Sequence, residues 1–284
     1  MTTLLGRAFT RITAAAASME VAHRQSRADQ FLGTDYPSLV DSPNGRFWFQ
    51  SMPLPDGSRV RGASADPGRE PNLWAACFGR SRDCLSGKTV LDVGANDGYF
   101  SLAALLCGAS EVAAVNTLEL THGTFPANLQ YAARKWQLAP RLIAADFHTL
   151  PTERKYDVIF FFGVLNHLES VHAGVRHLER LLAPNGRIYL ETPISGATAD
   201  VPVMEVASDV FGRVPQYRAG LNTVGNSNYL VPNELAVRAI AETHGLMVDP
   251  LPLAGLYEGS WGVGHTRRVF VLSRMSEGAL PKRG

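Results

Sequence analysis

Cysteine is scarce in this chain, and its spacing does not fit a disulfide framework or a structural zinc site. The 284 residues include only Cys77, Cys84 and Cys107, an odd number without a CxxC pair. Such usage favours a reducing compartment, and we expect a cytoplasmic protein. His172 and His177 lie five positions apart on an expected helix and therefore not on one face, so we also expect no metal site.

An excess of charge of either sign is missing, and so is any long apolar run. The chain has 27 Lys and Arg against 26 Asp and Glu, a formal net charge of +1. Because proteins that bind nucleic acid usually carry a basic excess, nucleic acid is disfavoured as a partner. The balance of charges does not exclude a local basic patch. No segment approaches the roughly 20 apolar residues that cross a bilayer, so no membrane partner is expected.

Residues 1–85 are expected to form an N-terminal extension made of a helix, a short strand, a loop and a second helix. Apolar residues recur at helical spacing near its start, at Leu5, Phe9, Ile12 and Ala16. The same stretch is basic and lacks acids, which is also the composition of a transit peptide, but we favour the helix. The aromatic-rich residues 45–50 predict the strand, and Asn72 is expected to cap a helix that runs to about Cys84.

From residue 86 onward, short apolar strands alternate with amphipathic helices. The expected strands are 89–93, 111–115, 141–145, 156–162, 187–191, 246–251 and 267–272, and the expected helices are 98–107, 126–136, 171–182 and 234–244. This alternation predicts an α/β fold, a Rossmann-like, seven-stranded, mostly parallel sheet with helices on both faces. Residues 195–230 interrupt the alternation and are expected to form a polar cap insertion.

A glycine-rich turn joins the first of these strands to the first helix, within residues 90–100. Ligands of open α/β folds bind at this carboxyl edge of the sheet, and Gly94 and Gly98 let the backbone approach a ligand closely. Asp92 suits a cationic ligand but would repel a pyrophosphate, and the three-glycine fingerprint is incomplete; both points argue against a nicotinamide-dependent dehydrogenase. An ordinary strand-to-helix turn is the alternative.

This turn resembles the first motif of class I S-adenosylmethionine (SAM)-dependent methyltransferases, an acid-x-Gly-x-Gly-x-Gly pattern. Asp92, Gly94 and Gly98 match the motif, while Asn96 stands at its middle glycine. The resemblance implies a SAM-binding domain over residues 86–284, in which Asp92 meets the ammonium group of SAM directly or through water. The cofactor-binding residues that it implies in the turn are Asp92, Gly94, Ala95, Asn96, Asp97 and Gly98.

Two further strand ends fit the same family. In the family, an acid after the second strand holds the ribose hydroxyls; here the position is Asn116, whose uncharged oxygen should bind more weakly, unless Glu119 substitutes for it. Asp146 matches the acid that reaches the adenine amino group, and Phe147 would supply an apolar wall for the ring. Taken alone, Asn116 could simply end its strand and Asp146 could form a local turn.

Residues 163–167, Gly-Val-Leu-Asn-His, resemble a Gly-Val-Leu-Tyr-His run in one branch of the family. That branch contains tRNA wobble-uridine carboxymethyltransferases and their methyltransferase relatives. The resemblance implies that Gly163 contacts the cofactor, and it makes His167 a candidate catalytic base that takes a proton from the acceptor. His167 could equally well only shape the pocket, because methyl transfer also proceeds through positioning alone.

The acceptor is expected to contact residues of the extension, of the 163–167 run and of the cap insertion, namely Trp48, Asn166, Asn228 and Tyr229. A tyrosine and an arginine that help hold a carboxylated SAM in the carboxymethyltransferases are replaced here by Asn166 and Asn226, which favours ordinary SAM. The leading hypothesis is methyl transfer to an oxygen or nitrogen of a small molecule, a sugar or specialised metabolite, in a biosynthetic step. The alternatives are a tRNA-modifying SAM-dependent transferase and a non-catalytic SAM-fold binding protein.

Overall fold

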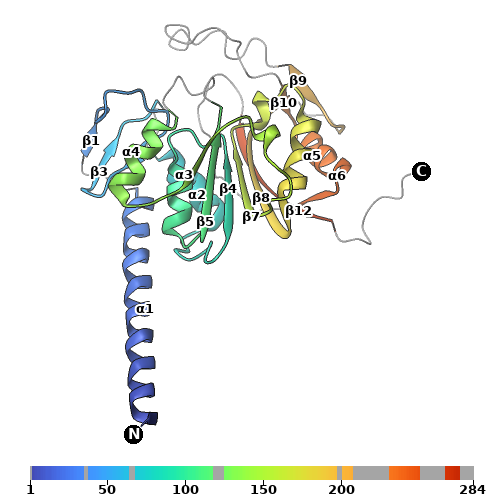
Figure 1. Ribbon diagram of the computed structural model, residues 1–284. Coiled ribbons are helices and arrows are strands. Elements are labelled where there is room, and N and C mark those ends of the chain that lie inside the picture. Colours follow the sequence, from blue (N-terminus) through green and yellow to red (C-terminus); the bar gives the residue numbers. More distant parts are fainter. Residues whose placement is uncertain are drawn as a thin grey trace.

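The computed structural model describes most of the chain. The described residues are 2–34, 38–63, 68–117, 125–196, 200–206, 230–249 and 266–275. Within them the backbone forms one seven-stranded sheet, a three-stranded sheet and a two-stranded sheet (Figure 1). The α-helices are α1 (Thr2–Leu32), α2 (Arg69–Phe78), α3 (Tyr99–Leu106), α4 (Ala127–Trp136), α5 (Val171–Leu181) and α6 (Glu234–Thr243).

The central sheet has the strand order β11-β12-β8-β7-β4-β5-β6. Its strands are β4 (Thr89–Val93), β5 (Glu111–Asn116), β6 (Arg141–Ala144), β7 (Tyr156–Phe162), β8 (Leu182–Ile194), β11 (Leu246–Asp249) and β12 (Thr266–Arg274). Only β12 runs against its neighbours, β8 and β11, whereas the other adjacent pairs are parallel. The predicted seven-stranded, mostly parallel sheet is confirmed.

Each face of this sheet has its own hydrophobic core, because successive side chains of a strand point to opposite sides. Val90 and Phe160 face a core that helices α1 to α4 complete. Their neighbours Leu91 and Ile159 face a second core with α5 and α6. Helices therefore cover both faces, as predicted.

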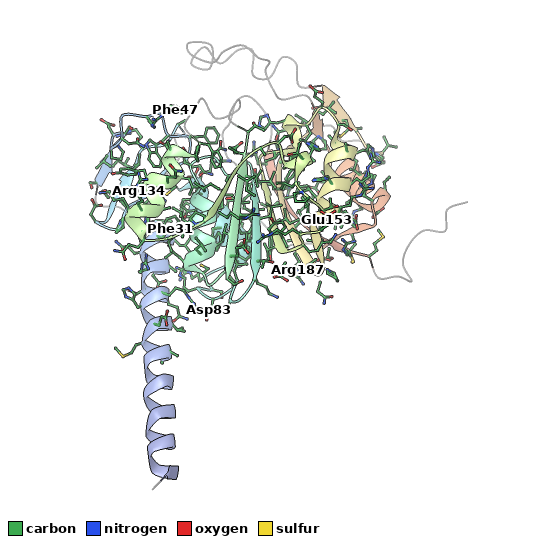
Figure 2. The ribbon with its side chains drawn as sticks, viewed as in Figure 1. Phe31, Phe47, Asp83, Arg134, Glu153 and Arg187 are labelled. Carbon is green, nitrogen blue, oxygen red and sulfur yellow. The ribbon has the colours of Figure 1, made fainter. Side chains whose placement is uncertain are left out.

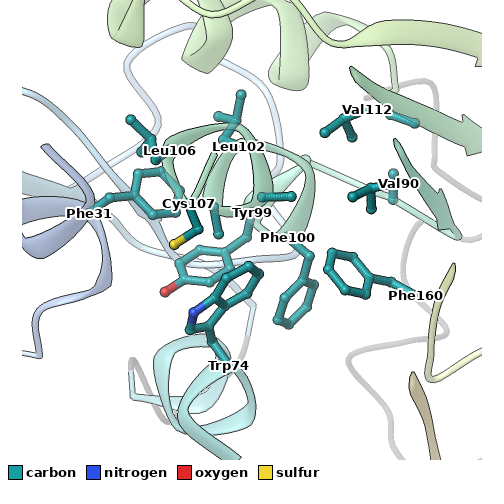
Figure 3. Close-up of a cluster of buried hydrophobic side chains, with 14 of the residues drawn as sticks. Phe31, Trp74, Val90, Tyr99, Phe100, Leu102, Leu106, Cys107, Val112 and Phe160 are labelled. Atoms are coloured by element: carbon teal, nitrogen blue, oxygen red, sulfur yellow. The ribbon is translucent and has the colours of Figure 1, made fainter. Parts of the chain in front are cut away.

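The N-terminal extension shares the first of these cores. Helix α1 is longer than predicted and runs to Leu32; its first part stands away from the body, and its last turns pack against it (Figure 1). Phe31 is fully buried and lies 4.9 Å from the ring of Tyr99 on α3. Figure 3 shows Phe31, Trp74 of α2 and Tyr99 in one cluster. The extension predicted up to residue 85 is thus packed as part of the main body.

Residues 45–50, which were predicted to form a strand, are irregular. The short strands are β1 (Ser38–Val40), β2 (Met52–Pro53) and β3 (Ser58–Val60), in the order β1-β3-β2. The N–H groups of Phe49 and Gln50 instead donate to the carboxylate of Asp97, at 2.5 and 2.8 Å. A long-range side-chain contact has therefore taken the donors that a strand would use for pairing.

Helix α2 begins three residues earlier than the cap predicted at Asn72. It starts at Arg69 and includes Pro71 in its first turn, where the missing N–H of a proline costs no helical hydrogen bond. It ends at Phe78, before Gly79, and not at about Cys84. Pro71, directly before the predicted cap, is therefore compatible with the helix.

Strand β8 also begins earlier than residue 187. Leu182 already pairs with Tyr156, and the pairing resumes at Arg187 opposite Val158. The residues between, which were predicted to form a turn, are accommodated as an irregularity in the ladder, because extra residues on one strand can bulge without ending the pairing. The strand continues to Ile194 at the carboxyl edge.

The cap insertion is described only at its two ends. Strand β9 (Met204–Val206) pairs antiparallel with β10 (Leu230–Pro232), so these ends lie together beside the sheet (Figure 1). Residues 207–229 lie outside the described part of the chain. No helix in the described residues combines the length and apolarity of a membrane span.

Candidate functional site

Three segments predicted to form a site follow neighbouring strands of the sheet. Residues 94–98 follow β4, Asn116 ends β5, and residues 163–167 follow β7, while β4 lies between β5 and β7. Because these strands are parallel, their carboxyl ends meet at one edge, where ligands of such folds bind. Phe47 lies at the top of the view and Asp83 and Arg187 lie lower (Figure 2). The fold thus brings the predicted segments together.

The glycine-rich turn is held in place by its own backbone and by strand β5. The N–H groups of Gly94 and Ala95 both donate to the carbonyl oxygen of Val115, at 2.9 and 3.1 Å. Gly94 and Gly98 have φ angles of +74° and +88°, which a glycine adopts readily. The N–H groups of Gly94 and Ala95 are therefore already used in hydrogen bonds within the protein.

Both glycines are also required by close packing within the protein. A Cβ at Gly98 would lie 2.1 Å from Cδ1 of Leu129 on α4, and a Cβ at Gly94 would lie 2.6 Å from Cγ2 of Val164. The prediction that they bind the cofactor stays a prediction. Their conformation and their lack of a side chain are already explained by the turn and its neighbours.

Asp92 lies below the turn, on β4, with only 2% of its surface exposed. The Ser101 hydroxyl donates to its carboxylate at 2.6 Å. Burial raises the pKa of Asp92 to about 7, and the Ser101 hydrogen bonds oppose this rise. Among the described residues no basic side chain forms an ion pair with Asp92, so a cationic ligand group would stabilise its charged form.

Asp97, at the other end of the turn, is fully buried among protein donors. Its carboxylate accepts the N–H groups of Phe49 and Gln50 and, at 2.8 Å, the side-chain amide of Asn128. Burial raises the pKa of Asp97 to about 6 against the effect of these donors. These contacts fasten the extension to the turn, and a cofactor contact of Asp97 stays a prediction.

Gln50 and Asn128 hold the extension and the glycine-rich turn together through contacts that the sequence did not reveal. The side-chain oxygen of Gln50 accepts the N–H of Tyr99, the first residue of α3, at 2.9 Å. Asn128 donates to the Phe47 carbonyl at 2.7 Å as well as to Asp97. No local pattern marks either residue, because each acts on a segment far away in the chain.

Trp48, a predicted acceptor contact, is 2% exposed. Its Nε1–H donates to Asn44 at 3.0 Å, and its ring packs edge-on against Tyr131. Its neighbour Phe47 is 51% exposed and is the aromatic side chain of this run that faces solvent. The acceptor contact of Trp48 stays a prediction, and its observed role is to pack the extension.

Asn116 is nearly buried at the end of β5, and its side-chain nitrogen donates to Oδ1 of Asn96 at 3.4 Å. Asp146, after β6, is exposed and accepts both the N–H and the ring Nδ1 of His148, each at 2.9 Å. Burial alone would raise the pKa of Asp146, but the His148 contacts hold it below its ordinary value. Phe147 is 6% exposed and packs beneath this turn. Asn96, Asn116, Asp146 and Phe147 end or directly follow strands β4, β5 and β6, at the predicted edge.

Gly163 lies beside a buried ion pair. Arg267 of β12 and Glu191 of β8 are joined by two hydrogen bonds, one of them at 2.8 Å between Nη2 and Oε2. A Cβ at Gly163 would lie 3.1 Å from Nη2 of Arg267. Burial would raise the pKa of Glu191, but the charge of Arg267 holds it below its ordinary value. The sequence did not reveal this pair, whose partners come from separate strands.

His167 and Asn166 lie on a short 3₁₀ helix, Leu165–His167, directly after β7. The N–H of His167 donates to the carbonyl of Val164 at 2.9 Å, which closes the turn. Nδ2 of Asn166 lies 3.5 Å from Nε2 of His167, so the buried amide contacts the half-buried imidazole. The predicted acceptor contacts Asn228 and Tyr229 lie outside the described residues.

Comparison with known proteins gives the family. The sequence profile of the methyltransferase domain family matches residues 73–237, more than half of the chain. The chain belongs to the methyltransferase domain family. The predicted membership of the class I SAM-dependent methyltransferases, with SAM as cofactor, is confirmed at this level. The family segment includes the glycine-rich turn and His167.

Curated relatives match part of the chain. A tRNA U34 carboxymethyltransferase of Idiomarina loihiensis is 34% identical over 110 residues, 39% of this chain and 34% of its own length. A malonyl-[acyl-carrier protein] O-methyltransferase of Halorhodospira halophila is 32% identical over 108 residues, 37% of this chain and 35% of its own. The chain thus spans about a third of the length of these relatives.

A solved structure with the same fold is the N-terminal domain of EvdMO1 with S-adenosylhomocysteine (SAH) bound. It superposes with a TM-score of 0.53 at 18% sequence identity, over 89% of this chain and 95% of that domain. At this identity the likeness concerns the fold alone. The family and the fold therefore agree. The class of acceptor is inferred from the residues of the site.

Proposed function

We propose that the protein transfers a methyl group from SAM to an oxygen or nitrogen of a small molecule, such as a sugar or a specialised metabolite, in a biosynthetic step. The observation that carries this proposal is the meeting of the glycine-rich turn, Asn116 and residues 163–167 at one edge of the sheet. In this arrangement one end of the site recognises the cofactor, and the other holds a candidate base.

The residues at this edge suit the three parts of SAM. Asp92 is a buried carboxyl group without a described cationic partner, which fits the ammonium group of the amino-acid part. Asn116 offers an amide oxygen for the ribose, and the exposed carboxylate of Asp146 fits the amino group of adenine. These acceptor oxygens therefore match a cationic nucleoside without phosphates.

The chemistry requires few functional groups from the protein. SAM supplies a methyl group that is already activated by the adjacent positive sulfur. The protein must hold the acceptor atom in line with that methyl group and exclude water, which alone accounts for a large rate enhancement. His167 would remove the proton of the acceptor hydroxyl or amine once its Nε2 faces the acceptor instead of Nδ2 of Asn166, 3.5 Å away.

Modification of tRNA is the second candidate function. Its support is the identity of 34% and 32% to tRNA U34 carboxymethyltransferases over 39% and 47% of the chain. Against it stands the near-neutral net charge of +1, whereas Asn166 in place of the tyrosine of that branch argues only against a carboxylated SAM as the cofactor. Filter binding of unmodified tRNA at about 50 and 200 mM salt distinguishes the two, because binding through phosphates weakens steeply with salt.

The first experiment is calorimetric titration of the full chain with SAM and with SAH, with NAD as the control ligand. We expect micromolar binding of both SAM and SAH and none of NAD. Failure of the intact chain to bind either compound would contradict the proposal and favour the non-catalytic alternative.

Catalysis is tested by mass spectrometry of a library of hydroxyl- and amine-bearing metabolites incubated with SAM and the protein. Once an acceptor is found, His167→Ala should lower kcat by about 100-fold while the Kd for SAH stays within twofold, as expected for loss of a general base. A decrease of less than tenfold would show that positioning alone drives the reaction.

A further inference from the structure

Two asparagines stand at the positions where this chain departs from its family's pattern, and they contact each other. Asn96 replaces the middle glycine of the turn, and Asn116 replaces the acid after the second strand. Nδ2 of Asn116 donates to Oδ1 of Asn96 at 3.4 Å. The two departures are therefore one structural feature.

Backbone hydrogen bonds hold the strand end at Asn116 and the part of the turn that precedes Asn96. The carbonyl of Val115 accepts the N–H groups of Gly94 and Ala95, and the carbonyl of Asn116 accepts the N–H of Ala145 at 3.1 Å. The strand before Asn116 is thereby tied to the turn on one side and to the end of β6 on the other.

Asn96 occupies a conformation that glycine would adopt at lower cost. Its φ angle is +49°, in the left-handed region, which asparagine tolerates better than other residues with a side chain. Glycine at this position would relieve that cost but would remove the acceptor of the Asn116 amide. The side chain of Asn96 therefore offsets some strain through this contact.

The contact matters because an amide, unlike a carboxylate, has two different ends. An asparagine side chain carries one acceptor oxygen and one donor nitrogen, whereas both oxygens of a carboxylate accept. When the nitrogen of Asn116 is engaged by Asn96, its oxygen stays available to accept a hydroxyl proton. Without Asn96 the amide could turn and present its nitrogen instead.

We propose that Asn96 is a positioning residue, which orients the Asn116 amide so that its oxygen accepts a ribose hydroxyl of SAM. This inference rests on the proposed function, because it concerns the same cofactor. It assigns to the pair Asn96 and Asn116 the task that a single carboxylate performs in the family pattern. Asn96 acts only through Asn116 and not on the methyl group.

The test is a double-mutant cycle with SAH as the ligand, measured by calorimetry on the full chain. Asn96→Gly, which suits a positive φ, should weaken SAH binding about fivefold, the effect of one lost hydrogen bond. In the Asn116→Asp background the same change should alter SAH binding by less than twofold, because a carboxylate needs no orientation. Equal effects in the two backgrounds would overturn the inference.

A second probe separates positioning from a general loosening of the turn. The 2′-deoxy and 3′-deoxy derivatives of SAH each lack one ribose hydroxyl. For at least one of them Asn96→Gly should bind as tightly as the unchanged protein, because the hydroxyl contact is absent in both. An equal fivefold loss for SAH and for both derivatives would assign Asn96 a purely structural role.

These outcomes are distinct from a failure of the proposed function. If the unchanged protein binds no SAH, the cofactor assignment falls and the inference falls with it. If it binds SAH but the cycle shows no coupling, only the inference on Asn96 falls. Thermal unfolding of each variant confirms that the titrated protein is folded.

Discussion

The two ends of the glycine-rich turn each hold a buried acid, but the protein treats the two acids differently. Asp97, at the end before α3, accepts two backbone N–H groups and one side-chain amide. Asp92, at the start on β4, has the Ser101 hydroxyl as its side-chain donor. The hydrogen-bonding capacity of Asp97 is thus used by the fold, whereas that of Asp92 is only partly used.

This difference separates a structural acid from a candidate ligand-binding acid. Burial raises the pKa of both groups, to about 7 for Asp92 and about 6 for Asp97. The more numerous donors around Asp97 offset more of the desolvation cost. Asp92 and Asp97 lie five positions apart in one motif. We nevertheless expect substitution of Asp97 to lower stability and substitution of Asp92 to weaken ligand binding.

The largest effect is expected from Asp97→Ala. It leaves the N–H groups of Phe49 and Gln50 and the amide of Asn128 without their common acceptor, and should lower the free energy of unfolding by about 3 kcal/mol. Urea denaturation followed by circular dichroism measures this loss. Asp83→Ala, at an exposed acid, is the control and should cost less than about 1 kcal/mol. A loss for Asp97→Ala as small as that of the control would contradict the structural role.

Asp92→Asn should act on binding in the opposite sense to stability. Loss of the charge should weaken SAM binding about 30-fold, or about 2 kcal/mol, as for a charge-assisted hydrogen bond. The unliganded variant should be more stable than the unchanged protein at pH 8, because a buried carboxylate is removed, and the gain should disappear at about pH 4. Calorimetry and thermal unfolding measure the two effects. Unchanged affinity for SAM would place the ammonium site elsewhere.

The pH dependence of binding should report Asp92 and not Asp97. Because the folded pKa of Asp92 is raised to about 7, the unliganded protein holds a proton there at lower pH, and SAH must displace it. Affinity for SAH should therefore fall about tenfold per pH unit below about 7, and this slope should vanish in Asp92→Asn. A slope that persists in that variant would assign the proton to another group.

The free energy of unfolding of the unliganded protein should fall as the pH rises, whereas the affinity for SAH should increase. The pKa values of Asp92 and Asp97 are raised in the folded state, so the protons they hold stabilise the fold fully below about pH 4. This contribution is lost as the pH rises through about 6 to 7. In Asp92→Asn the remaining loss should be complete at about pH 6 instead of about pH 7, which thermal unfolding across this range resolves.

The smallest effect is expected from Gln50→Ala. It removes one acceptor, for the N–H of Tyr99, and should lower the free energy of unfolding by about 1 kcal/mol. The Kd for SAH should change by less than twofold, because Gln50 supports the turn from the side of the extension. Urea denaturation and calorimetry measure the pair of values. A large loss of affinity with unchanged stability would place Gln50 in the ligand site.

Local patterns predicted the scaffold well. The alternation of strands and helices after residue 86 gave the order and nearly all bounds of the main elements, because burial on both faces and helix periodicity are properties of short segments. The errors lie where a distant contact overrides a local preference. Residues 45–50 form no strand because their N–H groups meet Asp97, and β8 starts early because Tyr156 pairs with Leu182.

The site was predictable in position but not in its partners. Asp92, Asn116 and His167 lie at the expected edge, because the carboxyl ends of parallel strands must meet there. Trp48 is buried against the body while its neighbour Phe47 is exposed, and the contact of Trp48 with the acceptor stays a prediction. An aromatic run predicts that some of its side chains will be buried. Which of them is buried depends on the residues that the tertiary structure brings next to the run.

The sequence by itself determined the α/β class, the strand that carries the glycine-rich turn and the resemblance to SAM-dependent methyltransferases, since each depends on residues close together in the chain. Only the tertiary structure decided which buried acid is engaged by the protein, that Asn116 contacts Asn96, and that Glu191 pairs with Arg267. Those relations join segments that are tens of residues apart. Their energies arise only when folding removes water from both partners at once.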